Sequence, residues 1–202
     1  MVPDLAPMLA ERGLPRGSLD SWAAEPKLDG WRVSVTVTGG RVAVRTRRGH
    51  DVTDRLPEIE ILAGAADELL LDGELVAGAG RADDFYALAS SLAGQPRRPG
   101  PPLSFWAFDV LWLDGELLTS RPYSERRAVL EALPLPHPAR IVKCWPATDT
   151  ADLLAACTEL GVEGVVLKRL RSIYLPGRRS TGWRKVKTPG WAAVHAPRRR
   201  PI

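Results

Sequence analysis

Lysine is rare in this chain, and its few positions are the first candidates for chemistry. Of the 28 basic residues, 23 are arginine and five are lysine. A guanidinium stays protonated in proteins, whereas an ammonium can lose its proton and become a nucleophile. A lysine in an arginine-rich chain is therefore a candidate for a reaction that arginine cannot perform. The candidates are Lys27, Lys143, Lys168, Lys185 and Lys187.

Lys27 has the local sequence that most favours a functional role. The segment Glu25-Pro26-Lys27-Leu28-Asp29-Gly30 predicts the end of a strand and then a tight turn, which would let the lysine project from a sheet rim into a cleft. An ordinary hairpin corner at Asp29-Gly30 is the alternative. Lys143 fits an ordinary strand residue in an apolar run. Lys168 fits either a functional position or a solvated strand end.

Three carboxylates and a lysine pair occur where a nucleotide site could use them. Asp72 and Glu74 lie inside an apolar strand, where carboxylates are costly unless they are paired or bind a metal. Glu163 precedes another apolar strand, and Lys185 and Lys187 share one face of a third. Two carboxylates can hold Mg²⁺ or a ribose, and paired lysines can bind phosphate oxygens. Because the sequence has no glycine-rich phosphate-binding signature, a bound nucleotide would be held by side chains.

These segments, taken in order, resemble the motif series of the ATP-dependent DNA ligases. The resemblance extends in particular to the bacterial ligases of end-joining repair, whose tract before the final motif is similar to Tyr174–Ser180. One such motif would be weak support, whereas six in the same order are specific. The six are Glu25–Arg32, Thr46–Gly49, Leu71–Leu75, Phe108–Leu111, Glu163–Lys168 and Trp183–Lys187.

The resemblance implies a role for each matched residue. Lys27 would attack the α-phosphorus of ATP, expel pyrophosphate and form a lysyl-AMP phosphoramidate. Phe108 would stack on adenine, although a lone phenylalanine in an apolar strand is more often a core residue. Glu74 and Glu163 would bind Mg²⁺ or Mn²⁺, and Glu74 is also a candidate for the ribose. The residues implied to contact the adenine edge, the ATP phosphates or the nick phosphate are Glu25, Arg32, Arg47, Arg179, Lys185 and Lys187.

The spacing of apolar residues predicts an α+β fold of mixed, largely antiparallel sheets with flanking helices. Regular strand–helix–strand alternation is missing, which argues against a doubly wound fold. The family resemblance implies a covalent nucleotidyltransferase or ATP-grasp-like adenylation domain. The predicted strands are Trp31–Thr38 and Arg41–Thr46, joined as a hairpin by Gly39-Gly40, then Leu69–Val76, Leu103–Leu113, Ala139–Trp145, Gly164–Lys168 and Trp183–Lys187. The predicted helices are Asp83–Ala93, Ser124–Ala132 and Thr150–Leu160, the last two with a Ser or Thr cap, and Gln95–Pro102 is a predicted loop.

Charge is distributed unevenly along the chain. Residues 168–202 carry eleven basic and no acidic side chains, whereas the remainder has a net charge of −7. A basic C-terminal strip indicates a polyanionic partner such as nucleotide phosphate or nucleic acid, and a solvated basic tail is the alternative. We expect a ligase-type adenylation domain over residues 1–190 and a basic Pro/Arg tail over residues 191–202.

Composition excludes several classes of protein. No run approaches the roughly 20 apolar residues of a membrane span, and the N-terminus lacks the order of a secretory signal. Cys144 and Cys157 form no CxxC motif and have no histidine at zinc-ligand spacing. We therefore expect no cysteine metal site and a thiol-reducing cytoplasm. These features predict a cytoplasmic protein, and the family resemblance implies a nucleoid-associated monomer that acts on nicked or broken double-stranded DNA. End-joining repair proteins or a separate oligonucleotide-binding domain are further candidate partners.

The sequence departs from the family pattern in two places. Family members continue after the final lysine pair into an oligonucleotide-binding barrel, but only fifteen residues follow Lys187 here, too few for a five-stranded barrel. Ser91 stands where related ligases often have arginine. The matched motifs predict that the chain forms lysyl-AMP. The departures predict that this chain alone seals nicks weakly or not at all. The alternatives are a non-catalytic truncated protein that binds nucleotide or DNA, and an RNA ligase or mRNA-capping nucleotidyltransferase.

Overall fold

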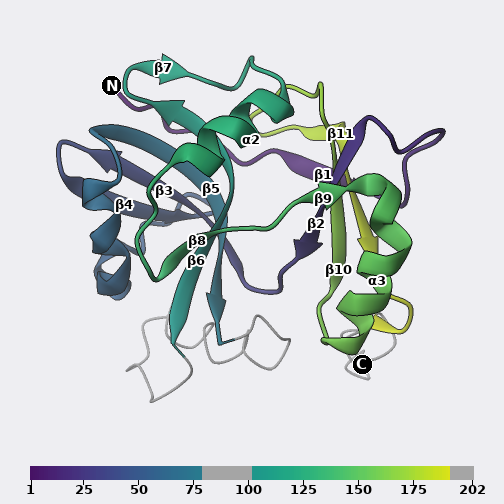
Figure 1. Ribbon diagram of the computed structural model, residues 1–202. Helices are drawn as coiled ribbons and strands as arrows, with labels where there is room; N and C mark the ends of the chain where they lie inside the picture. Colours follow the sequence, from purple (N-terminus) through teal and green to yellow (C-terminus); the bar gives the residue numbers. More distant parts are fainter. Residues whose placement is uncertain (79–101, 192–202) are drawn as a thin grey trace, which may run out of the picture.

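Two β-sheets and a few short helices make up the part of the chain that the structure, a computed structural model, describes: residues 1–78 and 102–191 (Figure 1). The strands of sheet A are β1 (Leu9–Arg12), β2 (Trp22–Lys27), β9 (Trp145–Pro146), β10 (Gly164–Arg169) and β11 (Arg179–Lys187). The strands of sheet B are β3 (Trp31–Thr38), β4 (Arg41–Thr46), β5 (Glu68–Ala77), β6 (Leu103–Leu113), β7 (Glu116–Leu117) and β8 (Ala139–Ile141). The helices are α2 (Tyr123–Ala132), α3 (Thr150–Glu159) and the 3-10 turns η1 (Thr53–Arg55), η2 (Pro57–Gly64) and η3 (Ala147–Asp149).

Sheet A has the strand order β1-β11-β10-β2-β9, and β1 pairs with β11 in parallel while the other pairs are antiparallel. Side chains alternate along β10, as the period of a strand requires. Val165 and Leu167 are fully buried in a small core beneath α3, which packs on β10 and β2. The opposite face of β10 presents Val166 and Lys168 to a cavity. One face of sheet A therefore supports the fold and the other faces a candidate site.

Sheet B has the order β4-β3-β5-β6-β7, with β8 beside β6. The predicted hairpin is confirmed, because β3 and β4 pair in antiparallel register up to Thr38 and Arg41. The alternating residues Val33, Val35 and Val37 lie in the main hydrophobic core. Helix α2 packs on β6, and η2 packs near β4. The predicted α+β class with largely antiparallel sheets is thus confirmed.

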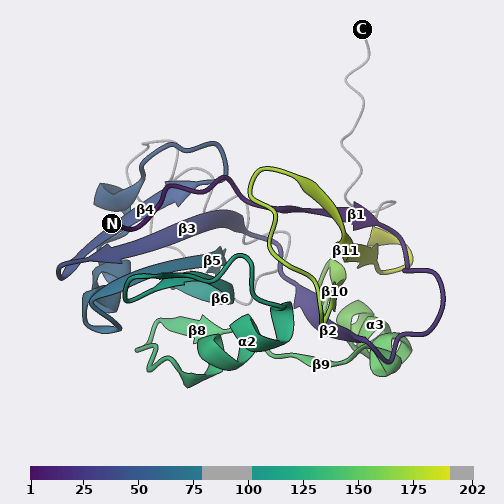
Figure 2. The same ribbon diagram turned by 90° about the horizontal axis from the view of Figure 1, so that it is seen from above.

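The two sheets meet where β2 leads into β3, and Figure 2 shows them side by side. The turn at Asp29-Gly30 is not a hairpin corner, because β2 pairs with β10 and β9 whereas β3 pairs with β4 and β5. A third hydrophobic cluster, which includes Met8, Tyr174 and Trp183, packs against residues of β5 and β6 and joins the sheets. Lys27 therefore stands at the end of its strand beside the junction of the sheets.

Four sequence-based expectations need correction or fall outside the described residues. The predicted strand Ala139–Trp145 is two short strands, β8 in sheet B and β9 in sheet A, because the chain crosses between sheets there, and Lys143 is an exposed residue of that crossing. Neither helix has a side-chain cap: α2 begins after Pro122, and Thr150 instead donates to the Ala147 carbonyl. The predicted helix Asp83–Ala93 and residues 95–101 of the predicted loop lie outside the described residues. None of the helices within the described ranges is long and apolar enough to cross a membrane.

Candidate nucleotide-binding site

A cavity of about 1250 Å³ is lined by residues of both sheets. It contains most of the side chains that the sequence singled out. Glu163 and Lys187 are not part of its lining, but both belong to an ion-pair cluster with Lys27 at its edge. The predicted site residues that line the cavity are Lys27, Glu25, Arg32, Arg47, Glu74, Phe108, Arg179 and Lys185.

The register of sheet A explains why residues far apart in sequence come together. Gly164 of β10 lies opposite Lys27 on one side and Lys187 on the other, so the two lysines flank a glycine. A Cβ at Gly164 would lie 2.1 Å from the carbonyl oxygen of Val186, and the backbone φ there is +153°. Only glycine fits such a position without a shift of the backbone. The close approach of β10 and β11 beside Lys27 thus depends on this residue.

Lys27, Glu163 and Lys187 form an open ion-pair cluster. Lys27 Nζ donates to one carboxylate oxygen of Glu163, and Lys187 Nζ lies 2.9 Å from the other. Burial alone would raise the pKa of Glu163, but the charges and hydrogen bonds of the two lysines lower it below its ordinary value. The Lys27 side chain keeps 24% of its surface exposed. Its ammonium is therefore held by a buried carboxylate and still faces the cavity.

Positive charge accumulates on the neighbouring part of β11. Burial and the nearby charges of Lys27, Arg12 and Arg179 lower the pKa of Lys185. Arg179 donates to the backbone carbonyl of Ala10 and also lines the cavity. Such a cluster of cations is electrostatically suited to an anion with several charges, such as a polyphosphate.

Arg32 is tied to Asp72, a carboxylate for which the family resemblance implied no role. Its Nε and Nη2 lie 2.9 and 2.6 Å from the two oxygens of Asp72, and the Tyr174 hydroxyl donates to Asp72 at 2.6 Å. Burial would lower the pKa of Arg32, but Asp72 outweighs it and raises that pKa. The backbone N–H of Met8 in turn donates to Tyr174. The predicted contact of Arg32 with a nucleotide or nick phosphate therefore has to use the nitrogen that Asp72 leaves free.

Glu25 and Lys168 belong to a buried network of polar side chains. Lys168 is not a solvated strand end, because it is 1% exposed and its Nζ lies 2.8 Å from Glu25 Oε2. The other oxygen of Glu25 accepts a hydrogen bond from Tyr123 and lies 3.5 Å from Arg127. Burial and the neighbouring Glu25 raise the pKa of Tyr123, so that its hydroxyl stays a donor. Glu25 lines the cavity as one member of a buried network.

Phe108 and Arg47 both line the cavity. The Phe108 ring is partly buried and meets Trp183 edge-on, with ring centroids 6.0 Å apart. The Arg32 guanidinium carbon lies 5.3 Å from the Phe108 centroid. Arg47 follows β4, and its backbone N–H donates to the Arg32 carbonyl at 3.1 Å. An aromatic ring exposed to a polar cavity can stack on a planar base.

The carboxylates of the site could supply only part of the coordination of a divalent ion. Within the described ranges, no group of three or more His, Cys, Asp or Glu side chains could enclose a metal. Burial raises the pKa of Glu74 to about 7, although Lys27 and Arg32 pull it down. Both oxygens of Glu163 are already occupied by lysines. These residues fit Mg²⁺ that keeps several waters and is bound through one carboxylate, Glu74, together with the phosphates of a substrate.

Sequence reasoning missed several residues that shape this cavity. The family resemblance implied no role for Asp72, Tyr174 or Trp183, and the structure places all three in contact with Arg32. Asp72 carried a signal, since a carboxylate in an apolar strand requires a partner. Tyr123 and Arg127 carried none, because they lie on a helix outside every quoted motif. Their proximity to Glu25 follows from how α2 packs on β6.

Three comparisons identify proteins similar to this chain. The family model described as "ATP dependent DNA ligase domain" matches residues 7–187. The multifunctional non-homologous end joining protein LigD of Mycolicibacterium smegmatis is 38% identical over 187 residues, which cover 91% of this chain and 24% of that protein. The crystal structure of the ligase domain from M. tuberculosis LigD is 36% identical with a TM-score of 0.73, over 91% of this chain and 59% of that one. A structure of mycobacterial DNA ligase D complexed with ATP and MES is 34% identical with a TM-score of 0.71, over 91% of this chain and 60% of that one.

The chain therefore spans about a quarter of the length of the curated relative and about three fifths of each of these two solved chains. The family model covers almost all of the described residues. Both sheets and the cavity between Lys27 and Phe108 fall within the matched range.

Proposed function

The chain belongs to the ATP-dependent DNA ligase domain family, and from this premise we propose that it transfers AMP from ATP to Lys27 as the first step of DNA strand joining. Residues 1–190 would form the adenylation domain and residues 191–202 a basic tail. The observation that carries the proposal is the position of Lys27. Its ammonium is paired with Glu163 at the edge of a large two-sided cavity, with Glu25, Phe108 and further cations around it.

Lys27 must lose a proton before it can act as a nucleophile. The nearest acceptor is the Glu163 carboxylate that already accepts its hydrogen bond, while Lys187 stays on the other oxygen. The amine lone pair then forms a bond to the α-phosphorus of ATP as the bond from that phosphorus to the pyrophosphate oxygen breaks. The nitrogen gives its second proton to solvent, which leaves a neutral phosphoramidate nitrogen. Pyrophosphate carries away the electron pair of the broken bond.

The remaining cavity residues would orient the substrate. Lys185 and Arg179 supply positive charge on β11, close enough to Lys27 that its charge lowers the pKa of Lys185. They would stabilise charge that develops on the phosphates during the displacement. Phe108 would stack on the adenine base. When bound, Mg²⁺ would neutralise phosphate charge, with Glu74 as its protein ligand.

The proposed substrate of the later steps is nicked or broken double-stranded DNA. Relatives of this chain are named for non-homologous end joining, and the C-terminal strip is strongly basic. End-joining repair proteins are the proposed partners, with a cytoplasmic, nucleoid-associated location for a monomer.

Labelling with nucleotide tests the adenylyl transfer directly. Purified protein is incubated with Mg²⁺ and ATP that carries its label at the α-phosphate, and acid-labile label on the protein is measured. Lys27→Arg should abolish the label with no change in thermal unfolding, because a guanidinium stays protonated. Lys143→Arg is the matched control, since Lys143 is exposed and outside the cavity lining, and it should label like wild type. Equal labelling of wild type and Lys27→Arg would refute the site, and stronger labelling by GTP than by ATP would favour a capping-type enzyme.

A further inference from the structure

A second cavity, of about 580 Å³, lies on the face of sheet A that the nucleotide site does not use. Side chains alternate along β11, so Trp183 and Lys185 line the nucleotide cavity while Arg184 lines the second one. On β10, Arg169 follows Leu167 by two residues and lies on the same face, where α3 packs. The two cavities share no lining residue in the part of the chain that the structure describes. A ligand in the second cavity, which we call the back pocket, would be separated from the nucleotide site by the sheet.

Arginine dominates the charge of the back pocket. Four of its lining residues are arginines, and no described lining residue is acidic. Arg16, Arg169 and Arg171 are exposed, and their side chains form no ion pair or hydrogen bond with any residue of the described ranges. The basic strip of residues 168–202 thus supplies cations to both faces of sheet A. Unpaired positive charge around a pocket attracts an anion.

The fourth arginine, Arg184, gives the back pocket a fixed wall. Its guanidinium pairs with Glu11 and donates to backbone carbonyls of residues 12–14, which holds this part of the chain against β11. The register against β1 passes from Ser180 directly to Arg184, so within these two fully described strands residues 181–183 have no partner on β1. Such a bulge bends a strand and re-aims its side chains. The pocket is therefore shaped by the fold and does not depend on the exposed arginines.

Apolar side chains form the rest of the back pocket. Trp22, Ile173 and Leu175 line it, and Ile173 is 45% exposed. Leu14, next to the lining residue Pro15, is 53% exposed. Arginine and large apolar residues are the types enriched in protein interfaces, where apolar groups form the centre and charges the rim. The combination indicates a ligand that has both an apolar and an anionic part.

We propose that the back pocket is a docking site for an acidic segment of a partner protein. A large apolar side chain of that segment sits against Trp22 and Leu175. Carboxylates on either side of it pair with Arg16, Arg169 and Arg171. Duplex DNA fits the pocket less well, because its bases are stacked inside and its outer surface would leave the apolar part of the pocket unfilled. Charge and apolar surface together therefore favour a peptide.

The test selects ligands from a displayed library of random peptides on the immobilised full chain. Peptides that surround one large apolar residue with Asp or Glu should be enriched. A fluorescently labelled peptide from this selection is then titrated by anisotropy. Arg169→Glu/Arg171→Glu should weaken its binding about 10- to 100-fold, because two attractions become repulsions. Replacing the apolar residue of the peptide with alanine should weaken binding about 10-fold.

Two controls separate the back pocket from net charge and from folding. Arg41→Glu/Lys143→Glu makes the same change in charge at exposed positions outside both cavities, and it should bind the peptide within about threefold of wild type. Thermal unfolding of both double variants should match that of wild type. If Arg169→Glu/Arg171→Glu does not fold, Arg169→Gln/Arg171→Gln replaces it, with an expected loss of binding of about 10-fold.

Three results would overturn the proposal. The first is that wild type enriches no acidic peptides over a parallel selection on Arg169→Glu/Arg171→Glu. The second is that the alanine peptide binds as well as its parent, which would mean that the pocket recognises charge alone. The third is that this variant, relative to the control, loses affinity for an intact labelled DNA duplex but not for the peptide. Lysyl-AMP formation by the variant should equal that of wild type, so a wild type that does not label refutes the proposed function and leaves the back pocket to its own test.

Discussion

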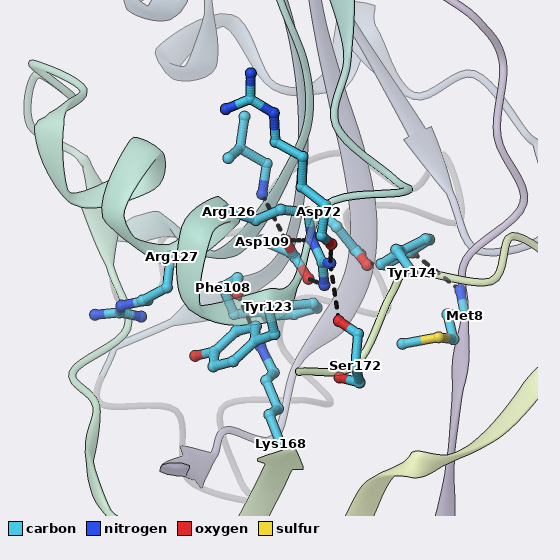
Figure 3. Close-up of polar contacts among 12 residues, drawn as sticks. Met8, Asp72, Phe108, Asp109, Tyr123, Arg126, Arg127, Lys168, Ser172 and Tyr174 are labelled. Atoms are coloured by element: carbon cyan, nitrogen blue, oxygen red, sulfur yellow. Dashed lines mark hydrogen bonds and ion pairs between the residues drawn. The ribbon is translucent and has the colours of Figure 1, made fainter. Parts of the chain in front are cut away.

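Two clusters of buried opposite charge in this molecule differ in how completely they are closed. Asp109 of β6 and Arg126 of α2 are both 0% exposed, and the guanidinium binds both carboxylate oxygens at 2.8 and 2.9 Å. Its remaining nitrogen donates to two backbone carbonyls, one of them on Ser172 (Figure 3). In the open cluster, by contrast, Lys27 and Lys187 share Glu163 and remain 24% and 46% exposed.

The difference matches the chemistry of the two cations. Arginine offers a planar fork that closes on a carboxylate and stays protonated, so the Asp109–Arg126 pair is a structural connection between β6, α2 and the loop at Ser172. Lysine offers a single charged atom that can lose a proton, so the open cluster can change its protonation when a substrate arrives. We infer that the closed Asp109–Arg126 pair contributes to folding and the open cluster to reaction. Variants of each cluster test this division.

The largest expected effect is on stability and comes from the closed pair. Arg126→Met should lower the free energy of unfolding by about 3–5 kcal/mol, because it leaves Asp109 buried without a counter-charge. Urea denaturation of the variant and of wild type measures the difference. Arg121→Met is the matched control: its partner Glu116 is 55% exposed, and loss of such a pair should cost about 1 kcal/mol or less.

The double variant Asp109→Asn/Arg126→Met sharpens the same test. It removes both charges, and the asparagine oxygen can still accept the Val110 N–H that Asp109 now accepts. Stability should therefore recover in part relative to Arg126→Met. If the double variant is the less stable of the two, a buried unpaired charge is not what makes the single change costly.

Most of sheet B could be predicted from the sequence, and the crossings between sheets could not. The strands Trp31–Thr38 and Leu103–Leu113 match their predictions because alternation and apolar runs are local signals. The segment Ala139–Trp145 was wrong as one strand, since its apolar residues serve two different sheets. The short β1 was missed because it pairs with β11, far away in the chain, and its own sequence has no strand pattern. The predicted side-chain caps of the helices were wrong, although α3 begins at Thr150 as predicted and α2 begins one residue before Ser124.

The residues of the site were predictable as a set, but their partners were not. Motif order placed Lys27, Glu163 and Lys187 together, and the register around Gly164 brings them into contact. No local pattern indicates that Lys168 is buried among three rings, since that depends on β6 and α2 lying against β10. Likewise, the register of β3 and β5 places Arg32 directly opposite Glu74, and its ion pair with Asp72 is a diagonal contact on the same strand pair. The roles assigned to the nucleotide-contacting residues stay predictions until ligand binding is measured.

The second prediction concerns the open cluster and should show the opposite pattern. Glu163→Gln should reduce the rate of lysyl-AMP formation on the order of 100-fold, because an amide cannot accept the proton of Lys27. The free energy of unfolding should fall by about 1 kcal/mol or less, since water can solvate the partly exposed lysines. Single-turnover labelling and urea denaturation on the same preparations separate the two effects. Glu159→Gln, which changes an exposed carboxylate on α3, should alter neither. A large loss of stability with normal labelling would show that Glu163, like the Asp109–Arg126 pair, contributes to folding and not to the reaction.

The smallest expected effect comes from Glu74, a buried carboxylate whose cationic neighbours offset only part of the cost of its burial. Burial raises its pKa from 4.5 to about 7, against the pull of Lys27 and Arg32. Below pH 4.5 this carboxyl is protonated in both the folded and the unfolded chain. As the pH rises from 4.5 to 7 the unfolded chain releases the proton first, so unfolding becomes progressively easier, and the stability that this group gave at low pH is lost above pH 7.

Glu74→Gln carries no titrating group, so its melting temperature relative to wild type should be higher at pH 8 than at pH 5. Glu60→Gln, at an exposed position of η2, is the control for removing a carboxylate. A difference between Glu74→Gln and wild type that is the same at both pH values, or that changes in the opposite direction, would show that Arg32 and Lys27 hold Glu74 ionised in the manner of a closed pair.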